Sequence, residues 1–172
     1  QSLVKAFLSQ PQQSPSFLDT SLLPDPKKLL ALLAKACSKE GQVLILVPEI
    51  ILLFGLEPWF HKYLPTAILA TLHSRLSPGQ TFSQWERIRS GEARIILATR
   101  QGLFAPFAKL AAVIVLEEQD DSYKQWDMSP RYHGKHVASF LATLMGAKLL
   151  LVSGTPSVES LVAIKSKALL PL

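Results

Sequence analysis

The sequence predicts an α/β domain built on a mostly parallel sheet, and three observations support this fold class. Short apolar runs alternate with segments of helical period along the chain. The runs are continuous rather than alternating, which is typical of strands covered on both faces. The chain has 172 residues, 48% of them apolar and only 18% charged, so it can bury one core but has few charges for its surface. We therefore expect one globular domain whose surface is partly covered by a partner.

The first predicted element is a leader. Residues 1–26 are rich in Gln, Ser and Pro and show no sustained period, so we expect a leader or linker that ends near Pro26. A helix is predicted over 27–39, with Gly41 as the C-cap glycine that ends it. The domain over 27–172 continues with strands at 43–47, 67–72, 94–98, 112–116 and 148–152, and with helices at 77–89, 135–145 and from about 156 onwards.

Composition limits the compartment and the ligands. The net charge is +5, and residues 61–100 carry six Lys or Arg against two Asp or Glu, which favours a polyanionic partner. The lone Cys37 cannot form an internal disulfide, and there is neither a secretion signal nor an apolar stretch of about 20 residues, so we expect a cytoplasmic protein. Four scattered histidines and one cysteine predict no metal site. A chain that runs from Gln1 to Leu172 favours a fragment of a longer protein.

Ligands of parallel sheets bind beyond the carboxyl ends of the strands, so the residues after each predicted strand are the candidates for chemistry. Glu117 and Glu118 open an acidic cluster that could hold magnesium or orient a water molecule, or could be a solvated turn. The segment 153–157 could present N–H groups to a phosphate, or could simply cap a helix. Neither alternative is excluded by the pattern.

Two further segments suit nucleic acid. Thr99 and Arg100 offer a hydroxyl and a guanidinium to a phosphate, unless Arg100 is an ordinary surface arginine. Aromatic and basic groups interleave at Tyr123, Lys124, Gln125, Trp126, Arg131, Tyr132 and His133. Stacking with charge holds single strands, each stacked base contributing about 1–3 kcal/mol, although a packed loop would show the same composition. We expect Trp59 and Trp85 to be packing residues.

These segments together resemble a known family. Residues 47–50, 72–74, 91–94, 99–100, 103–107, 122–125, 131–133 and 153–157 match, in order and at similar spacing, the first motor lobe of the PriA family of replication-restart DNA helicases in superfamily 2. The resemblance spans roughly 27–165, and the pair 122–125 and 131–133 is its most specific part. It implies a RecA-like three-layer sandwich of the P-loop NTPase type.

The resemblance also implies roles for individual residues. The family's motifs that contact the DNA strand include the positions of Pro48, Glu49, Thr99 and Arg100. The residues Tyr123, Lys124, Trp126, Arg131, Tyr132 and His133 fall in its aromatic-rich loop, which links single-strand binding to ATP hydrolysis. Ser153, Gly154, Thr155 and Pro156 match the motif that relays between the two sites. The implied partners are single-stranded or forked DNA, primosome or other replication proteins, and a second helicase lobe that is not in this chain.

The ATP site departs from the family. Counting back from Val47, the phosphate-binding GxTGSGKT is replaced by residues Asp19 to Pro26, without a glycine or a lysine. The family's Asp-Glu-Glu-His becomes Leu116-Glu117-Glu118-Gln119, where Glu117, with Glu118 beside it, still fits the water-activating position. We therefore expect a DNA-binding lobe that hydrolyses no ATP and needs no cofactor. Two alternatives stay open: a fragment of an active ATP-dependent 3'-5' helicase that holds Mg-ATP differently, and a non-catalytic protein-interaction domain.

Overall fold

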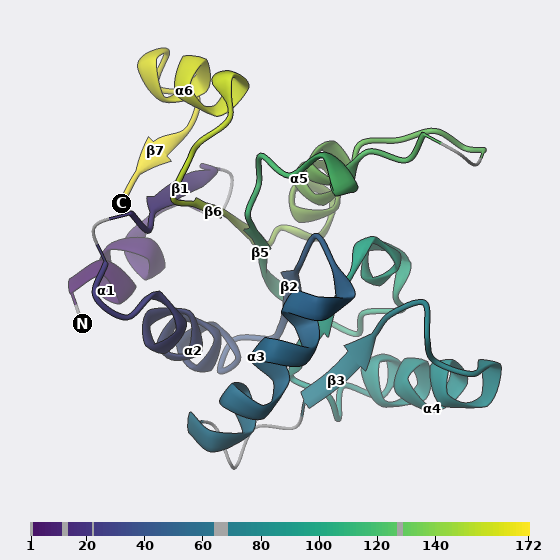
Figure 1. The fold of residues 1–172 in the computed structure, drawn as a ribbon. Helices are drawn as coiled ribbons and strands as arrows, with labels where there is room; N and C mark the ends of the chain where they lie inside the picture. The colour runs from purple at the N-terminus through teal and green to yellow at the C-terminus, as the bar shows by residue number, and fades with distance from the viewer. Residues whose placement is uncertain (1, 12–13, 22, 64–68, 127–128) are drawn as a thin grey trace.

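A seven-stranded sheet forms the centre of the computed structural model, which describes residues 2–11, 14–21, 23–63, 69–126 and 129–172 (Figure 1). The strand order is β3-β4-β2-β5-β6-β1-β7, and every pair of neighbours in the described sheet is parallel. The strands are β1 (Ser16–Asp19), β2 (Gln42–Leu46), β3 (Leu69–Leu72), β4 (Ile95–Ala98), β5 (Leu110–Leu116), β6 (Lys148–Ser153) and β7 (Leu170–Pro171). The predicted fold class is confirmed.

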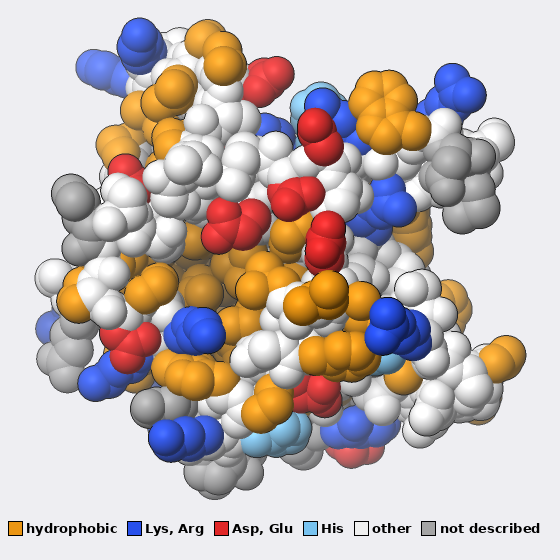
Figure 2. Space-filling view, in the orientation of Figure 1, with side chains coloured by type: hydrophobic (Ala, Val, Ile, Leu, Met, Phe, Trp, Pro, Cys, Tyr) orange, Lys and Arg blue, Asp and Glu red, His pale blue; other side chains and the backbone are white. Residues whose placement is uncertain are grey.

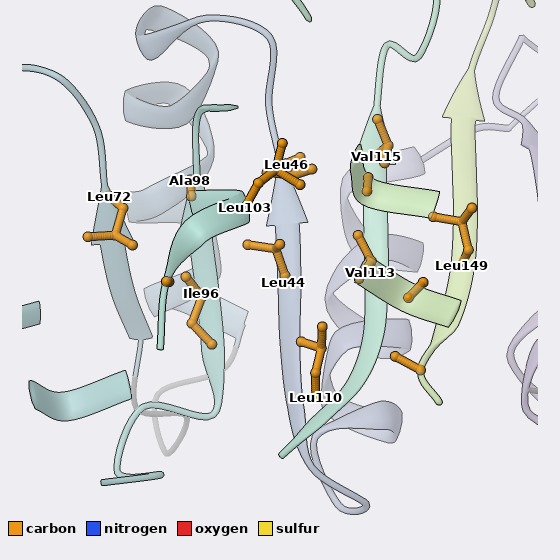
Figure 3. Packing of buried hydrophobic residues seen from close by; sticks show 14 of the residues in the cluster. Leu44, Leu46, Leu72, Ile96, Ala98, Leu103, Leu110, Val113, Val115 and Leu149 are labelled. Carbon is orange, nitrogen blue, oxygen red and sulfur yellow. The ribbon is translucent and has the colours of Figure 1, made fainter. Parts of the chain in front are cut away.

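Helices cover both faces of the sheet. They are α1 (Ser2–Ser9), α2 (Pro26–Cys37), α3 (Ile50–Tyr63), α4 (Pro78–Arg89), α5 (Gly134–Met145) and α6 (Val158–Lys165), with short 3-10 turns η1 (Arg100–Phe104) and η2 (Asp121–Tyr123). Val43 and Ile45 pack with α1, α2 and α3 on one face, whereas Leu44 and Leu46 pack with η1 and α5 on the other (Figure 3). Because successive residues of β2 are buried on opposite faces, the strand reads as one continuous apolar run.

The predicted leader over 1–26 is wrong in one respect, because part of it belongs to the core. β1 pairs with β6 on one side and β7 on the other, and Phe17 and Leu18 are buried. Lys148 at the start of β6 donates hydrogen bonds from Nζ to the carbonyl oxygens of Leu8 and Gln10 and so holds the end of α1. The strand is only four residues long and follows two prolines, so it leaves no periodic pattern in the sequence.

Gly41 is not the C-cap of the helix that precedes it. α2 ends at Cys37 and its C-cap is Ser38, whose carbonyl accepts hydrogen bonds from the Arg94 guanidinium, with Nη2 at 2.7 Å. Gly41 is required for a different reason: a Cβ at this position would stand 2.7 Å from the carbonyl oxygen of Lys109. The glycine therefore permits a close approach of two backbones rather than a helix end.

Helix α3 has no counterpart among the predicted elements. Leu53, Leu56 and Phe60 are buried, but Ile51 and Phe54 on the same helix are exposed, so apolar residues surround the helix instead of forming one stripe. The other predicted helices and strands are confirmed to within about two residues. For the strand predicted at 67–72, residues 67 and 68 lie outside the described residues.

Candidate nucleic-acid interface

A cleft of about 490 Å³ opens at the carboxyl ends of β2, β3 and β4. The cleft is lined by all four residues that the family's DNA-contact motifs predict: Pro48, Glu49, Thr99 and Arg100. These residues come from two separate loops. Arg75 lines it as well, from the loop after β3. The parallel topology thus brings these loops together at one edge, as expected for a ligand site of an α/β sheet.

Only part of the basic middle segment faces this cleft. Arg87 pairs with Glu92 at 3.1 Å and Arg89 with Glu86 at 2.9 Å, both on the surface of α4. Arg94 is held by the carbonyl of Ser38. Figure 2 shows acidic side chains gathered near the centre of the visible face, with Lys and Arg scattered around them. The positive charge available to a ligand in the cleft therefore comes from Arg75 and Arg100.

A hairpin-like loop forms one wall of the cleft. Lys124 and His133 form an antiparallel bridge, and the amide of Gln125 donates to the carbonyl of Tyr132 at 2.8 Å. The loop projects away from the body of the molecule before α5 (Figure 1). Trp126 is 66% exposed and lies beneath Lys124, whose Nζ is 5.8 Å from the centre of the indole ring. Trp126 and Arg131 are exposed and thus available to a ligand, whereas Lys124 Nζ is already paired with the Asp121 carboxylate at 2.6 Å.

Tyr123 is not available to a ligand, so its predicted contact with DNA is wrong. The side chain is fully buried. Its hydroxyl lies 2.6 Å from the carbonyl oxygen of Leu116 and 3.1 Å from that of Leu46, and burial raises the pKa of the phenol. Tyr123 therefore joins the ends of β2 and β5 beneath the loop, which loop composition alone cannot distinguish from an exposed aromatic residue.

His133 has a structural contact as well as a place in the loop. It is the N-cap of α5, where its Nδ1 accepts a hydrogen bond from the amide of Lys135 at 3.3 Å. Burial, together with the nearby His136, lowers its pKa, which favours the neutral ring that this acceptor role needs. Tyr132 is half-buried and lies edge-on to Phe104, with ring centres 5.5 Å apart.

Residues Asp19 to Pro26, which the family resemblance aligns with its phosphate-binding loop, lie between β1 and the first turn of α2. A strand, a loop and a helix follow one another there, which is the arrangement of a phosphate-binding loop. The N-terminus of α2 is closed by the chain itself, because the Asp25 carboxylate accepts from the amide of Lys28 at 3.0 Å. Pro24 and Pro26 have no N–H to offer. A phosphate would meet a carboxylate at the point where it needs donors.

Glu117 keeps a distinctive geometry at the end of β5. Its φ of 48° places a non-glycine residue in the left-handed region, which stores strain of about 1–2 kcal/mol. Its carboxylate accepts from Gln119 Nε2 at 3.0 Å, and Gln119 Oε1 accepts from Ser153 Oγ at 2.7 Å. Ser153 Oγ in turn accepts from the amide of Thr155 at 2.8 Å. One chain of hydrogen bonds therefore connects the Glu117 carboxylate with the segment 153–155.

Glu118 differs from its neighbour and is not placed for catalysis, contrary to the prediction. Its side chain is completely buried, 2.7 Å from Lys135 Nζ, and it accepts from the amide of Ser157 at 2.7 Å. Burial by itself would raise the pKa of this carboxyl, but the bonds from Lys135 and Ser157 outweigh it and the pKa lies below the ordinary value. The carboxylate thus fixes the starts of α5 and α6. Lys135 was not anticipated, since nothing in its spacing marks it, whereas Ser157 belongs to the segment 153–157 that the sequence singled out.

Among the described residues, no three His, Cys, Asp or Glu side chains come together in a way that could hold a metal ion. No helix in the described part of the chain combines the length and apolar character needed to cross a bilayer.

Comparison with solved structures defines the class of fold. The chain superimposes on the helicase domain of Hef from Pyrococcus furiosus with a TM-score of 0.64, covering 99% of this chain and 37% of that one at 15% identity. It superimposes on the C-terminal domain of the DEAD-box protein Dbp5 from S. cerevisiae with a TM-score of 0.68, covering 92% and 89% at 11% identity. At such identities the likeness establishes the fold alone: a RecA-like helicase domain.

Comparison of sequences narrows the class. The chain is 42% identical over 123 residues to the replication restart protein PriA of Haemophilus influenzae and 37% identical over 126 residues to that of Bacillus subtilis. These alignments cover 70% and 73% of this chain but only 16% and 15% of the relatives. No family model matches. The chain is therefore a PriA-like helicase lobe that spans about a sixth of the length of these relatives.

Proposed function

We propose that this lobe binds single-stranded or forked DNA in the cleft at the ends of β2, β3 and β4, and that it does not hydrolyse ATP by itself. The observation that carries the proposal is the meeting of Arg75, Thr99 and Arg100 in one cleft walled by a loop with exposed Trp126. A guanidinium suits a phosphate and an exposed indole suits a base. The similarity to PriA proteins supports a place in replication restart, beside replication proteins and a second helicase lobe.

Loss of ATP hydrolysis is supported at two separate places in the fold, the start of α2 and the end of β5. Asp25 and Pro26 occupy the helix start that should receive the phosphates. Leu116 stands where the family has its magnesium-associated aspartate. Either change removes an interaction with the charged triphosphate, and the second is independent of the first. No cofactor is needed for the proposed binding function.

The test is oligonucleotide binding at several salt concentrations, measured by fluorescence anisotropy with labelled oligo-dT. Arg75→Gln and Arg100→Gln should each weaken binding on the order of tenfold and lower the salt slope by about 0.7, the value for one phosphate contact with a single strand. Arg89→Gln is the matched control, because this arginine is paired with Glu86 on α4, outside the cleft residues. Binding that is absent, or equal in all these proteins, would refute the assignment.

A second candidate function has its own support. Val158, Leu161 and Val162 form an exposed apolar stripe on α6, and Phe140 and Leu144 form another on α5. Such faces are typical of protein interfaces. If the chain is a protein-interaction domain instead, oligo-dT should not bind in a salt-dependent way.

A further inference from the structure

We propose that Arg100 is a positioning residue that bridges a DNA phosphate in the cleft to the loop from Lys124 to His133. The inference rests on the proposed function, since it presumes a strand in the cleft. It adds that binding of the phosphate and the position of the loop depend on one guanidinium, so that each stabilises the other.

The first observation is a hydrogen bond across the wall of the cleft. Arg100 Nη1 donates to the main-chain carbonyl of Lys124 at 2.7 Å, and the side chain is half-buried. Lys124 is the residue whose backbone bridges to His133. The guanidinium therefore holds the loop at its base, where the two arms of the loop meet.

The second observation is that the same short turn contacts the other arm. Arg100 begins η1 and Phe104 ends it. The Phe104 ring lies edge-on to Tyr132, with ring centres 5.5 Å apart, and Tyr132 accepts the amide hydrogen bond of Gln125. A turn of five residues thus touches both arms of the loop, one through Arg100 and one through Phe104.

The third observation concerns the remaining donors. A guanidinium carries five N–H groups in a planar fork. Within the described part of the chain, Arg100 uses Nη1 on the Lys124 carbonyl and has no other protein acceptor. The Nε and Nη2 edge is then open to two oxygens of a phosphate in the cleft that Arg100 lines. Both contacts can exist at the same time.

Arg75 provides the comparison that isolates this role. It lines the same cleft and carries the same charge, but among the described residues no hydrogen bond or ion pair joins it to the loop. A lysine at position 100 would keep the charge but lose the planar fork that serves two acceptors at once. Loss of charge and loss of the bridge can therefore be separated by three variants: Arg75→Gln, Arg100→Gln and Arg100→Lys.

The experiment is hydrogen exchange of the 124–133 backbone, followed by mass spectrometry on the full chain with and without saturating oligo-dT. Without oligo-dT, both Arg100 variants should exchange on the order of tenfold faster in this segment, the factor for one lost charge-assisted bond. Arg75→Gln should match the unaltered chain. With oligo-dT, exchange should slow in the unaltered chain and in Arg75→Gln, but not in Arg100→Lys. Amides of β5 and β6 report whether each variant is folded.

The outcomes separate this inference from the proposed function. Suppose that residues 124–133 exchange in Arg100→Lys and Arg100→Gln as they do in the unaltered chain, both without oligo-dT and with it. The bridge is then refuted, while DNA binding stands. If the unaltered chain does not bind oligo-dT, the proposed function and the phosphate bridge both fall. The resting exchange of the Arg100 variants then decides by itself whether the bond to Lys124 positions the loop.

Discussion

Glu118 and Lys135 form a buried pair, so losing one of the two charges should cost more stability than losing one charge of a surface pair. The carboxylate has no exposed area and the ammonium group very little, whereas the side chains of Arg87 and Glu92 are 30% and 53% exposed. Removing one partner of a buried pair leaves the other charge without compensation. The pair therefore belongs to the framework of the site rather than to its chemistry.

Glu118→Gln should lower the free energy of unfolding by about 2–4 kcal/mol, because it leaves Lys135 buried without an opposite charge. Urea denaturation measures this directly. Glu92→Gln, which removes an exposed partner, should cost at most about 1 kcal/mol. Equal effects of the two changes would contradict the role assigned to the buried pair.

The same pair predicts a dependence on pH. The pKa of Glu118 is lower in the folded chain than in the unfolded one, so the unfolded chain takes up the proton first as the pH falls. The stabilisation is complete above the unfolded pKa of about 4.3 and is lost as the pH drops through the folded pKa. The difference in stability between the unaltered chain and Glu118→Gln should therefore narrow below about pH 4.3. A constant difference down to the acid transition would argue against this linkage.

At the scale of the elements, α1 is attached to the sheet through the Lys148 side chain as well as through the buried Phe7. Lys148 Nζ reaches the carbonyl of Leu8 at 2.8 Å and also that of Phe7, over whose ring it lies. These carbonyls are at the end of α1, where a helix lacks internal partners. A positive charge there also complements the helix dipole.

Lys148→Met should free α1 while it leaves the sheet folded. We expect a loss of about 1–3 kcal/mol in the free energy of unfolding, from carbonyls left without a donor. Hydrogen exchange of the α1 amides should increase more than that of β5. Lys165→Met is the control, since this lysine lies in the last turn of α6 on the surface. Unchanged exchange in α1 would show that apolar packing of Phe7 is sufficient.

The elements also show how far the sequence determines the fold. The strand at 43–47 was predictable because both of its faces are buried, so every residue is apolar. β1 was not, because a four-residue strand is stabilised by its neighbours β6 and β7 rather than by its own pattern. α3 was missed because its outward side is apolar as well. Pairing partners and exposed apolar faces are properties of the assembled molecule.

The sequence predicts the candidate site only in part, because it shows which residues follow a strand but not which side chains are buried. Pro48, Glu49, Thr99 and Arg100 could be proposed because they follow apolar runs, and parallel strands align such positions. The burial of Tyr123 and Glu118 could not, because charge and aromaticity in a loop do not reveal which side chains point inward. Their partners, Leu46 and Lys135, are distant in sequence.

At the scale of the whole molecule, the candidate DNA cleft and the phosphate-loop position lie at different places along the edge of the sheet. The edge formed by β2, β3 and β4 keeps a cleft with Arg75 and Arg100. The neighbouring position after β1 is closed by Asp25. The two sites lie on different strands, so change in one need not disturb the other.

The most direct test is calorimetric titration of Mg-ATP into the chain, with and without a single-stranded oligonucleotide. We expect no heat of ATP binding in either case, while the oligonucleotide binds and loses affinity as salt is raised. Micromolar binding of Mg-ATP would contradict the account, because it would require phosphate donors at a helix start that Asp25 and Pro26 close.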